Sequence, residues 1–169
     1  CYRGLYERLI YGEFLEKRVS NVMVNTNTPI IEEYYKNYHS PTVVILSGSP
    51  SDDWHIEKLK KHCRNHNLYF RDHICSAHKK TKQLLKILDE YNENPNRKIV
   101  FITVAGMSNA LSGVVTCNTH HPVIACPPHE NKMDMMTNIN STLQMPSKVP
   151  VATILHAENC ILFCKKILC

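Results

Sequence analysis

Apolar runs of strand length alternate with helical patterns from residue 42 to the last residue of the chain. This alternation is typical of repeated strand-helix units around a parallel sheet. Because crossovers between parallel strands are almost always right-handed, it predicts an α/β fold, a three-layer, doubly wound parallel sheet of flavodoxin-like or Rossmann-like arrangement. The five predicted strands are 42–46, 68–75, 99–104, 122–126 and 149–155, and predicted helices include 82–91, 108–117, 133–143 and 157–168.

The first 40 residues do not show this alternation of strand and helix patterns. They combine a short amphipathic stretch with a polar, turn-like segment at 21–29. We therefore interpret 1–40 as an extension or linker that packs on the domain or on a neighbouring subunit, and 41–169 as the α/β domain.

Composition narrows the class of protein. With 43% hydrophobic and 21% charged residues, and with no apolar run of about 18 residues, the chain is predicted to be globular and not to enter membranes. The net charge of +5 includes a basic cluster around Lys58–Arg64, which we interpret as a solvated helix face rather than a nucleic-acid site.

The eight cysteines show no paired short spacing of the zinc-binding kind, so no metal is expected from them. Most lie within apolar runs, which favours reduced core thiols in a cytoplasmic protein. A secreted, disulfide-linked form is the alternative, because four of the eight lie near the ends of the chain.

Ligands of open α/β sheets bind beyond the carboxyl ends of the strands. After the first predicted strand comes a turn of small and polar residues that opens a helix. Its backbone N–H groups and hydroxyls suit a phosphate, although an ordinary capped turn, with Ser51 or Asp52 as the cap, explains it equally well. The candidate residues are Gly48, Ser49, Ser51 and Asp52.

The next two strand ends carry further candidates. His78 followed by Lys79 is suited to proton transfer beside a cation, because imidazole exchanges a proton near neutral pH, while a solvated loop histidine is the plainer alternative. Gly106 permits close backbone approach, and Ser108 can cap the next helix. The full sets are Ser76, Ala77, His78 and Lys79, then Ala105, Gly106, Ser108 and Asn109.

In this order and spacing, over about 125 residues, the motifs resemble those of the aminoimidazole ribonucleotide (AIR) carboxylase family, in its animal-type branch. The resemblance implies a flavodoxin-like domain, a homo-octamer, and no metal or organic cofactor. It also implies a reaction of purine biosynthesis, in which carbon dioxide adds to C4 of the imidazole of a ribonucleotide. The motifs are Gly48-Ser49-x-Ser51-Asp52, Ser76-Ala77-His78-Lys79, Ala105-Gly106-x-Ser108-Asn109, Asn118-Thr119-x-x-Pro122 to Pro128, and Met145-Pro146-Ser147.

The resemblance also implies roles for the candidate residues. His78 would carry the C4 proton, and Lys79 would complete the nucleotide pocket with Ser76 and Ala77. The first turn, Gly48 to Asp52, would hold the ribose phosphate and hydroxyls. The third set, Ala105, Gly106, Ser108 and Asn109, would border the carbon dioxide.

Four positions depart from the family pattern, and they leave two hypotheses open. The family usually has Arg at Met107, whose loss removes a bidentate anion donor, and Gly at Ala110, Cys117 and Lys148. Lys148 could restore the lost charge from another loop. The first hypothesis is an active carboxylase. The second is a relative that lost catalysis and serves as a structural, storage or interaction protein.

Overall fold

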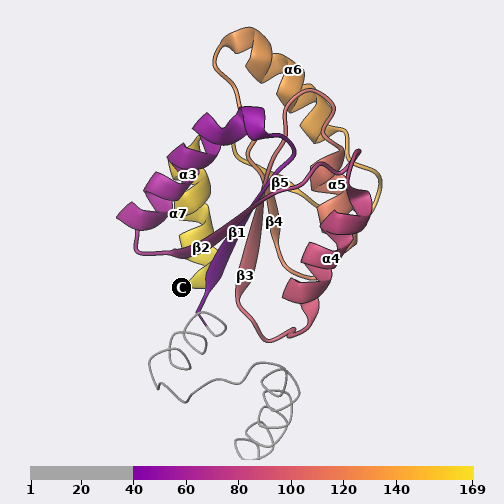
Figure 1. Ribbon diagram of the computed structural model, residues 1–169. Coiled ribbons are helices and arrows are strands. Elements are labelled where there is room, and N and C mark those ends of the chain that lie inside the picture. Colours follow the sequence, from indigo (N-terminus) through magenta and orange to yellow (C-terminus); the bar gives the residue numbers. More distant parts are fainter. Residues whose placement is uncertain (1–39) are drawn as a thin grey trace, which may run out of the picture. The chain divides into compact units, whose positions relative to one another are not determined.

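The computed structural model describes residues 40–169 (Figure 1). The predicted extension therefore lies, except for Ser40, outside the described residues. In chain order the elements are β1 (Thr42–Ser47), η1 (Pro50–Asp52), α3 (Asp53–Asn65), β2 (Tyr69–Ile74), α4 (Thr81–Asn92), β3 (Ile99–Val104), α5 (Ala110–Cys117), β4 (Val123–Ala125), α6 (Lys132–Leu143), β5 (Ala152–Thr153) and α7 (Ala157–Leu168).

All five strands form one parallel sheet in the order β2-β1-β3-β4-β5. This is the flavodoxin-like strand order, so the predicted fold class is confirmed. The inner strand β1 pairs along its whole length with β2 on one side and β3 on the other. β1 and β3 are buried throughout, whereas the charged edge strand β2 combines partly buried with exposed residues.

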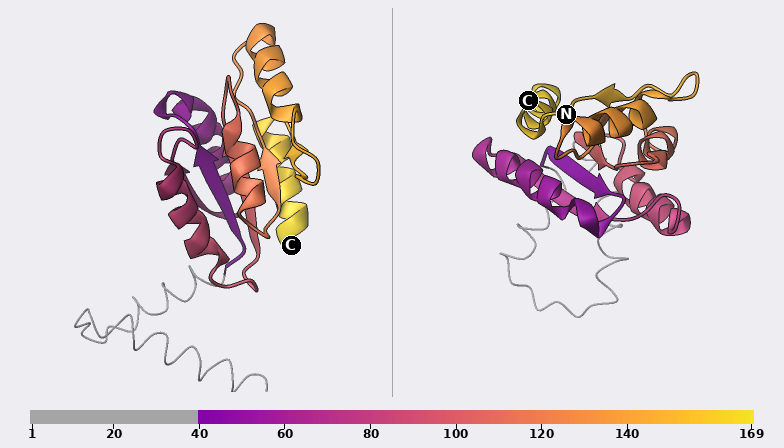
Figure 2. Two further views of the ribbon diagram at one scale, coloured as in Figure 1. Left: turned by 90° about the vertical axis from the view of Figure 1, so that its right-hand side faces the viewer. Right: turned by 90° about the horizontal axis from the view of Figure 1, so that it is seen from above.

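Alternate side chains of the strands pack into two separate hydrophobic cores. Val43 and Ile45 pack with α3 and α7, while Val44 and Leu46 pack with α4 and α5. Since successive strand residues point to opposite faces, one apolar strand supplies both cores. The helices consequently form outer layers on both faces of the sheet (Figures 1 and 2).

Two details of the prediction were wrong. The fifth strand is confined to Ala152–Thr153 instead of 149–155, in part because Pro150 has no N–H to donate to a neighbouring strand. The predicted caps also differ. Asp52, one of the two predicted residues, occupies the N-cap position of α3 but makes no side-chain cap hydrogen bond, while Ser49 caps η1 by accepting from the Ser51 N–H. Asn109, not Ser108, caps α5.

Seven cysteines lie in the described part of the chain, and all seven are free. Five are buried, as the apolar runs around them predict, while Cys117 and Cys169 are exposed. Among residues 40–169, every helix is too short or too polar to cross a lipid bilayer.

His73 on β2 makes stability depend on pH. Its Nε2 lies 2.8 Å from the Tyr91 hydroxyl, and burial lowers the pKa of His73, an effect that Arg71 reinforces while Asp72 and Glu90 oppose it. Above about pH 6.5 His73 is neutral in both states and contributes nothing; below it the unfolded chain binds a proton that the folded chain resists. We therefore expect the free energy of unfolding to fall as the pH drops below about 6.5.

Urea unfolding of wild type and His73→Gln between about pH 7.5 and pH 5 would measure this effect. Glutamine retains a hydrogen-bonding group but does not titrate, so its curve should be flatter. Equal pH slopes for the two proteins would contradict the assignment.

Candidate active site

A hollow of about 120 Å³ lies at the carboxyl ends of β1, β2 and β3, the upper edge of the sheet in Figure 1. It unites the three strand-end motifs that are separate in sequence. Two backbone hydrogen bonds hold the loops together: Gly48 N–H donates to Val104 O (3.0 Å), and Cys75 N–H donates to Ser47 O (2.8 Å). The lining residues are Gly48, Ser49, Asp52, Ser76, Ala77, His78, Ala105, Gly106, Ser108 and Leu111.

The turn after β1 is held by hydroxyl groups. The buried Ser47 Oγ donates to Ser49 O (2.7 Å) and accepts from Ser49 N–H (3.2 Å). Ser49 Oγ in turn accepts from the Ser51 N–H (3.2 Å) and lies 2.8 Å from the Ser51 hydroxyl. These bonds fix a short turn before α3, in which Ser49 lines the hollow and Ser51 does not.

Asp52 supplies the one carboxyl group of this lining. Partial burial raises its pKa, whereas the Ser51 hydroxyl and the nearby His55 act in the opposite direction. His55 is itself buried, and its Nε2 lies 3.4 Å from Cys126 Sγ at the end of β4. An ionised Asp52 offers oxygens that accept hydrogen bonds from sugar hydroxyls.

His78 lies in the turn between β2 and α4. Ser76 organises this turn, because its Oγ accepts from Lys79 N–H (3.3 Å) and its carbonyl accepts from Lys80 N–H (2.9 Å). Thr81 Oγ1 closes it by donating to Ala77 O. His78 is exposed and lines the hollow together with the Gly48-Ser49 turn.

The loop after β3 is fixed by Asn138 of α6. Asn138 Oδ1 accepts from Met107 N–H (2.7 Å), and its Nδ2 donates to Pro128 O (2.6 Å). A Cβ at Gly106 would lie 3.3 Å from Asn138 Nδ2, so glycine is favoured here by a protein neighbour. The sequence predicts a close approach at Gly106, and the structure identifies Asn138 as the neighbour that approaches it.

Three of the predicted site residues do not line the hollow. Ser51 and Lys79 are exposed at its margin, whereas Asn109 is buried in a polar network. Asn109 Nδ2 donates to Ser112 Oγ (2.8 Å) and Thr142 Oγ1 (3.0 Å), and its Oδ1 accepts from Ser112 N–H (3.1 Å). Leu111 was not predicted as a site residue, but it lines the hollow. An apolar residue within a predicted helix gives no indication in the sequence that it contacts a ligand site.

None of the four positions that depart from the family pattern lines the hollow. Met107 is 76% exposed, and Ala110 and Cys117 lie in α5 with ordinary helical backbone. Lys148 is exposed and has a φ of 67°, in the left-handed region that favours glycine. The left-handed backbone conformation thus explains why the family usually has Gly at the position that Lys148 occupies in this chain.

Replacing Lys148 by Gly should raise the free energy of unfolding by about 0.5–1 kcal/mol, because relief of the left-handed strain exceeds the entropy that glycine adds to the unfolded chain. Urea unfolding would measure the gain. Lys148→Ala is the matched control and should show no such gain. An unchanged carboxylation rate in that control would remove the idea that Lys148 replaces the charge lost at Met107.

The fold agrees with comparisons to known proteins. The family model for AIR carboxylase matches residues 42–169. A bifunctional phosphoribosylaminoimidazole carboxylase/succinocarboxamide synthetase of Drosophila melanogaster is 40% identical over 75% of this chain and 29% of its own length. A phosphoribosylaminoimidazole carboxylase of Archaeoglobus fulgidus is 41% identical over 73% of this chain and 67% of its own length.

A solved structure is also similar. The crystal structure of Treponema denticola PurE superimposes with a TM-score of 0.70 at 37% identity, over 75% of this chain and 79% of that one. The fold and the hollow define a flavodoxin-like protein with a candidate ligand site at its strand ends. The chain belongs to the AIR carboxylase family, and it spans less than a third of the length of the bifunctional fly relative.

Proposed function

We propose that the protein carboxylates 5-aminoimidazole ribonucleotide with carbon dioxide to give 4-carboxy-5-aminoimidazole ribonucleotide, a step of purine biosynthesis. One observation carries the proposal: His78 and the hydroxyl-rich Gly48-Ser49 turn line the same hollow. A proton carrier thus faces a turn suited to a phosphate. Membership of the AIR carboxylase family supports the same reaction.

The proposed chemistry needs positioning and one proton transfer. The amino-substituted imidazole is electron-rich at C4, so C4 forms a bond to the carbon of carbon dioxide and one C=O π pair moves to oxygen as a carboxylate. His78 then removes the C4 proton, and the C4–H electrons restore the aromatic ring. Hydroxyl and backbone donors stabilise the new carboxylate. Lys79, beside His78, adds positive charge at the margin, and no metal or organic cofactor takes part.

The hollow of one chain is small for this substrate. Sites for small molecules usually have about 300–1,000 Å³, whereas this one has about 120 Å³. We infer that it holds part of the ribonucleotide and that a second copy of the chain encloses the rest. A homo-oligomer, with the octamer of the family as the expected form, accords with the exposed apolar side chains of Met107, Met133, Met136 and Leu143 near the loops.

The remaining parts of the proposal concern context. Free, mostly buried cysteines support a place in the cytoplasm, where thiols stay reduced. Nucleic acid and membranes are not proposed as partners. Residues 1–40 are proposed to be an extension or linker that precedes the carboxylase domain at 41–169.

The direct test is to incubate the full chain with aminoimidazole ribonucleotide and bicarbonate and to follow the carboxylated product. Formation of that product by wild type would support the proposal. Ribonucleotide binding without turnover would favour the inactive alternative, which no observation on residues 40–169 favours. An absence of both binding and turnover would contradict the assignment of the hollow.

A further inference from the structure

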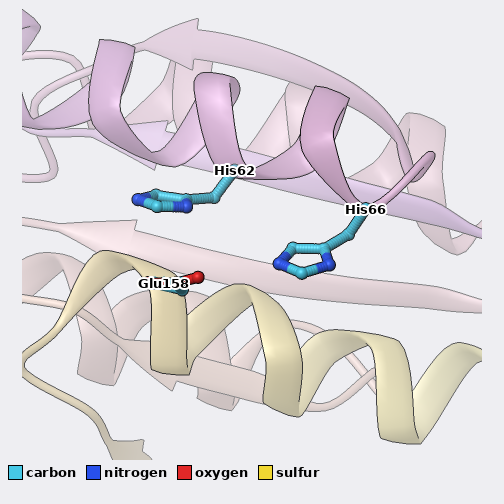
Figure 3. A group of neighbouring side chains, drawn as sticks. All are labelled: His62, His66 and Glu158. Carbon is cyan, nitrogen blue, oxygen red and sulfur yellow. The ribbon is translucent and has the colours of Figure 1, made fainter.

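His62 lies in the last turn of α3, and His66, four residues later, is the C-cap residue of the same helix. Glu158 lies opposite them in the first turn of α7. Figure 3 shows both imidazole rings directed at α7, with the Glu158 carboxylate turned towards them. One nitrogen of each ring and one carboxylate oxygen all lie within 4.8 Å of one another. The group is separate from the candidate active site, because none of the three residues lines the 120 Å³ hollow.

The two helices that carry these side chains have fixed backbones. Leu59 and Cys63 of α3 and Cys160 and Cys164 of α7 are fully buried in the same core. Histidines four residues apart lie on the same face of a helix, so His62 and His66 both project into the groove beside this contact. The three donor atoms are therefore held close together by packing that does not depend on any interaction among them.

The donor set is the chemically informative feature. Nδ1 of His62 is buried and has no hydrogen-bond partner among residues 40–169, and leaving a buried polar atom unpaired is costly. Two imidazoles and one carboxylate are a ligand set found in catalytic zinc sites, where a water molecule occupies the fourth coordination position. We propose that His62, His66 and Glu158 bind one divalent transition-metal ion, with Zn²⁺ as the best match.

The geometry needs only a small adjustment. Donor atoms around a tetrahedral zinc ion lie about 3.4 Å apart, because each lies about 2.0–2.2 Å from the metal. Glu158 is exposed and free to change rotamer, so it can approach the more deeply placed imidazoles. Magnesium and calcium are poorer candidates, since both favour oxygen ligands.

Space for a coordinating water is available beside the group. His62 and Glu158 also line a hollow of about 360 Å³ between α3 and the start of α7. Lys58 lines the same hollow, but its ammonium lies 4.5 Å from the centre of the Trp54 ring, where a cation-π contact holds it. This group was not predicted from the sequence, because His62 was interpreted as part of a solvated basic face and the cysteine spacing alone was used to predict metal binding.

Zinc titration of the full chain in competition with a chromophoric chelator would test the proposal. One ion per chain should bind, and Glu158→Gln or His66→Gln should each weaken binding by about 100-fold or more, since loss of even an outer-shell partner costs roughly 10- to 100-fold. His120→Gln, which alters an exposed histidine on a different loop, is the matched control and should bind as wild type does.

The absorption spectrum of the cobalt(II)-substituted protein would show which kinds of atom bind the metal. The proposed nitrogen and oxygen ligands give weak visible bands, whereas cysteine thiolates add an intense charge-transfer band. Circular dichroism and thermal melting of the metal-free variants would establish that they remain folded. Undetectable binding, equal affinity in wild type and both variants, or a thiolate spectrum would each overturn the proposal, whatever the carboxylase assay shows.

Discussion

Replacement of His78 by Asn should lower the rate of carboxylation by about 10²–10⁴-fold, the usual contribution of a positioned acid-base group. Asparagine is similar in size and forms hydrogen bonds, but it cannot accept the C4 proton. Because the turn around His78 is held by Ser76 and Thr81, the substitution should leave the lining of the hollow in place. Product formation under saturating ribonucleotide would measure the effect.

Binding and turnover should respond differently to this substitution. The Gly48-Ser49 turn holds the proposed phosphate position without help from His78, so the dissociation constant for the ribonucleotide should change little while kcat falls. His120→Asn provides the control for a histidine outside the hollow. A wild-type rate no higher than that of His78→Asn would end the enzyme hypothesis.

Replacement of Asn109 by Ala should lower the free energy of unfolding by about 2–4 kcal/mol, and the melting temperature by roughly 5–12 °C. Asn109 is buried, caps α5 through Ser112, and donates to Thr142 of α6. Alanine would remove the cap and leave the buried partners Ser112 and Thr142 with fewer hydrogen bonds. Thermal and urea unfolding would measure the loss.

Asn131→Ala is the matched control for this substitution. Asn131 also caps a helix, by accepting from Met133 N–H and Asp134 N–H, but it is exposed. Its loss should therefore cost only about 1 kcal/mol. A small loss of stability in Asn109→Ala together with a large rise in KM would instead restore Asn109 to the substrate contacts that the sequence analysis assigned to it.

Local patterns were sufficient to predict most of the fold. The apolar runs around Val44, Phe101 and Ile124 marked buried strands, and the helical pattern of 82–91 marked α4. The gathering of three motifs in one hollow followed from parallel strands ending at one edge of the sheet. Residues directly after those strands, such as Ser49 and His78, were therefore predictable site candidates.

Contacts between distant segments were not predictable in this way. The pairing of Asn109 with Thr142, and that of Met107 with Asn138, depends on where α6 docks, which no local spacing encodes. For the same reason, Asn109 was predicted from the sequence to contact the substrate, whereas in the structure it belongs to a buried hydrogen-bond network. His62 and Glu158 likewise meet only because α3 and α7 pack side by side.

The two hydrogen bonds of Asn138 give α6 an influence beyond its own packing. A single amide joins the loop after β3, at Met107, to the loop after β4, at Pro128. A slight shift of this helix would displace both loops in concert. Substitutions within Lys132–Leu143 that shift α6 are therefore expected to move these two loops without changing any residue that lines the hollow.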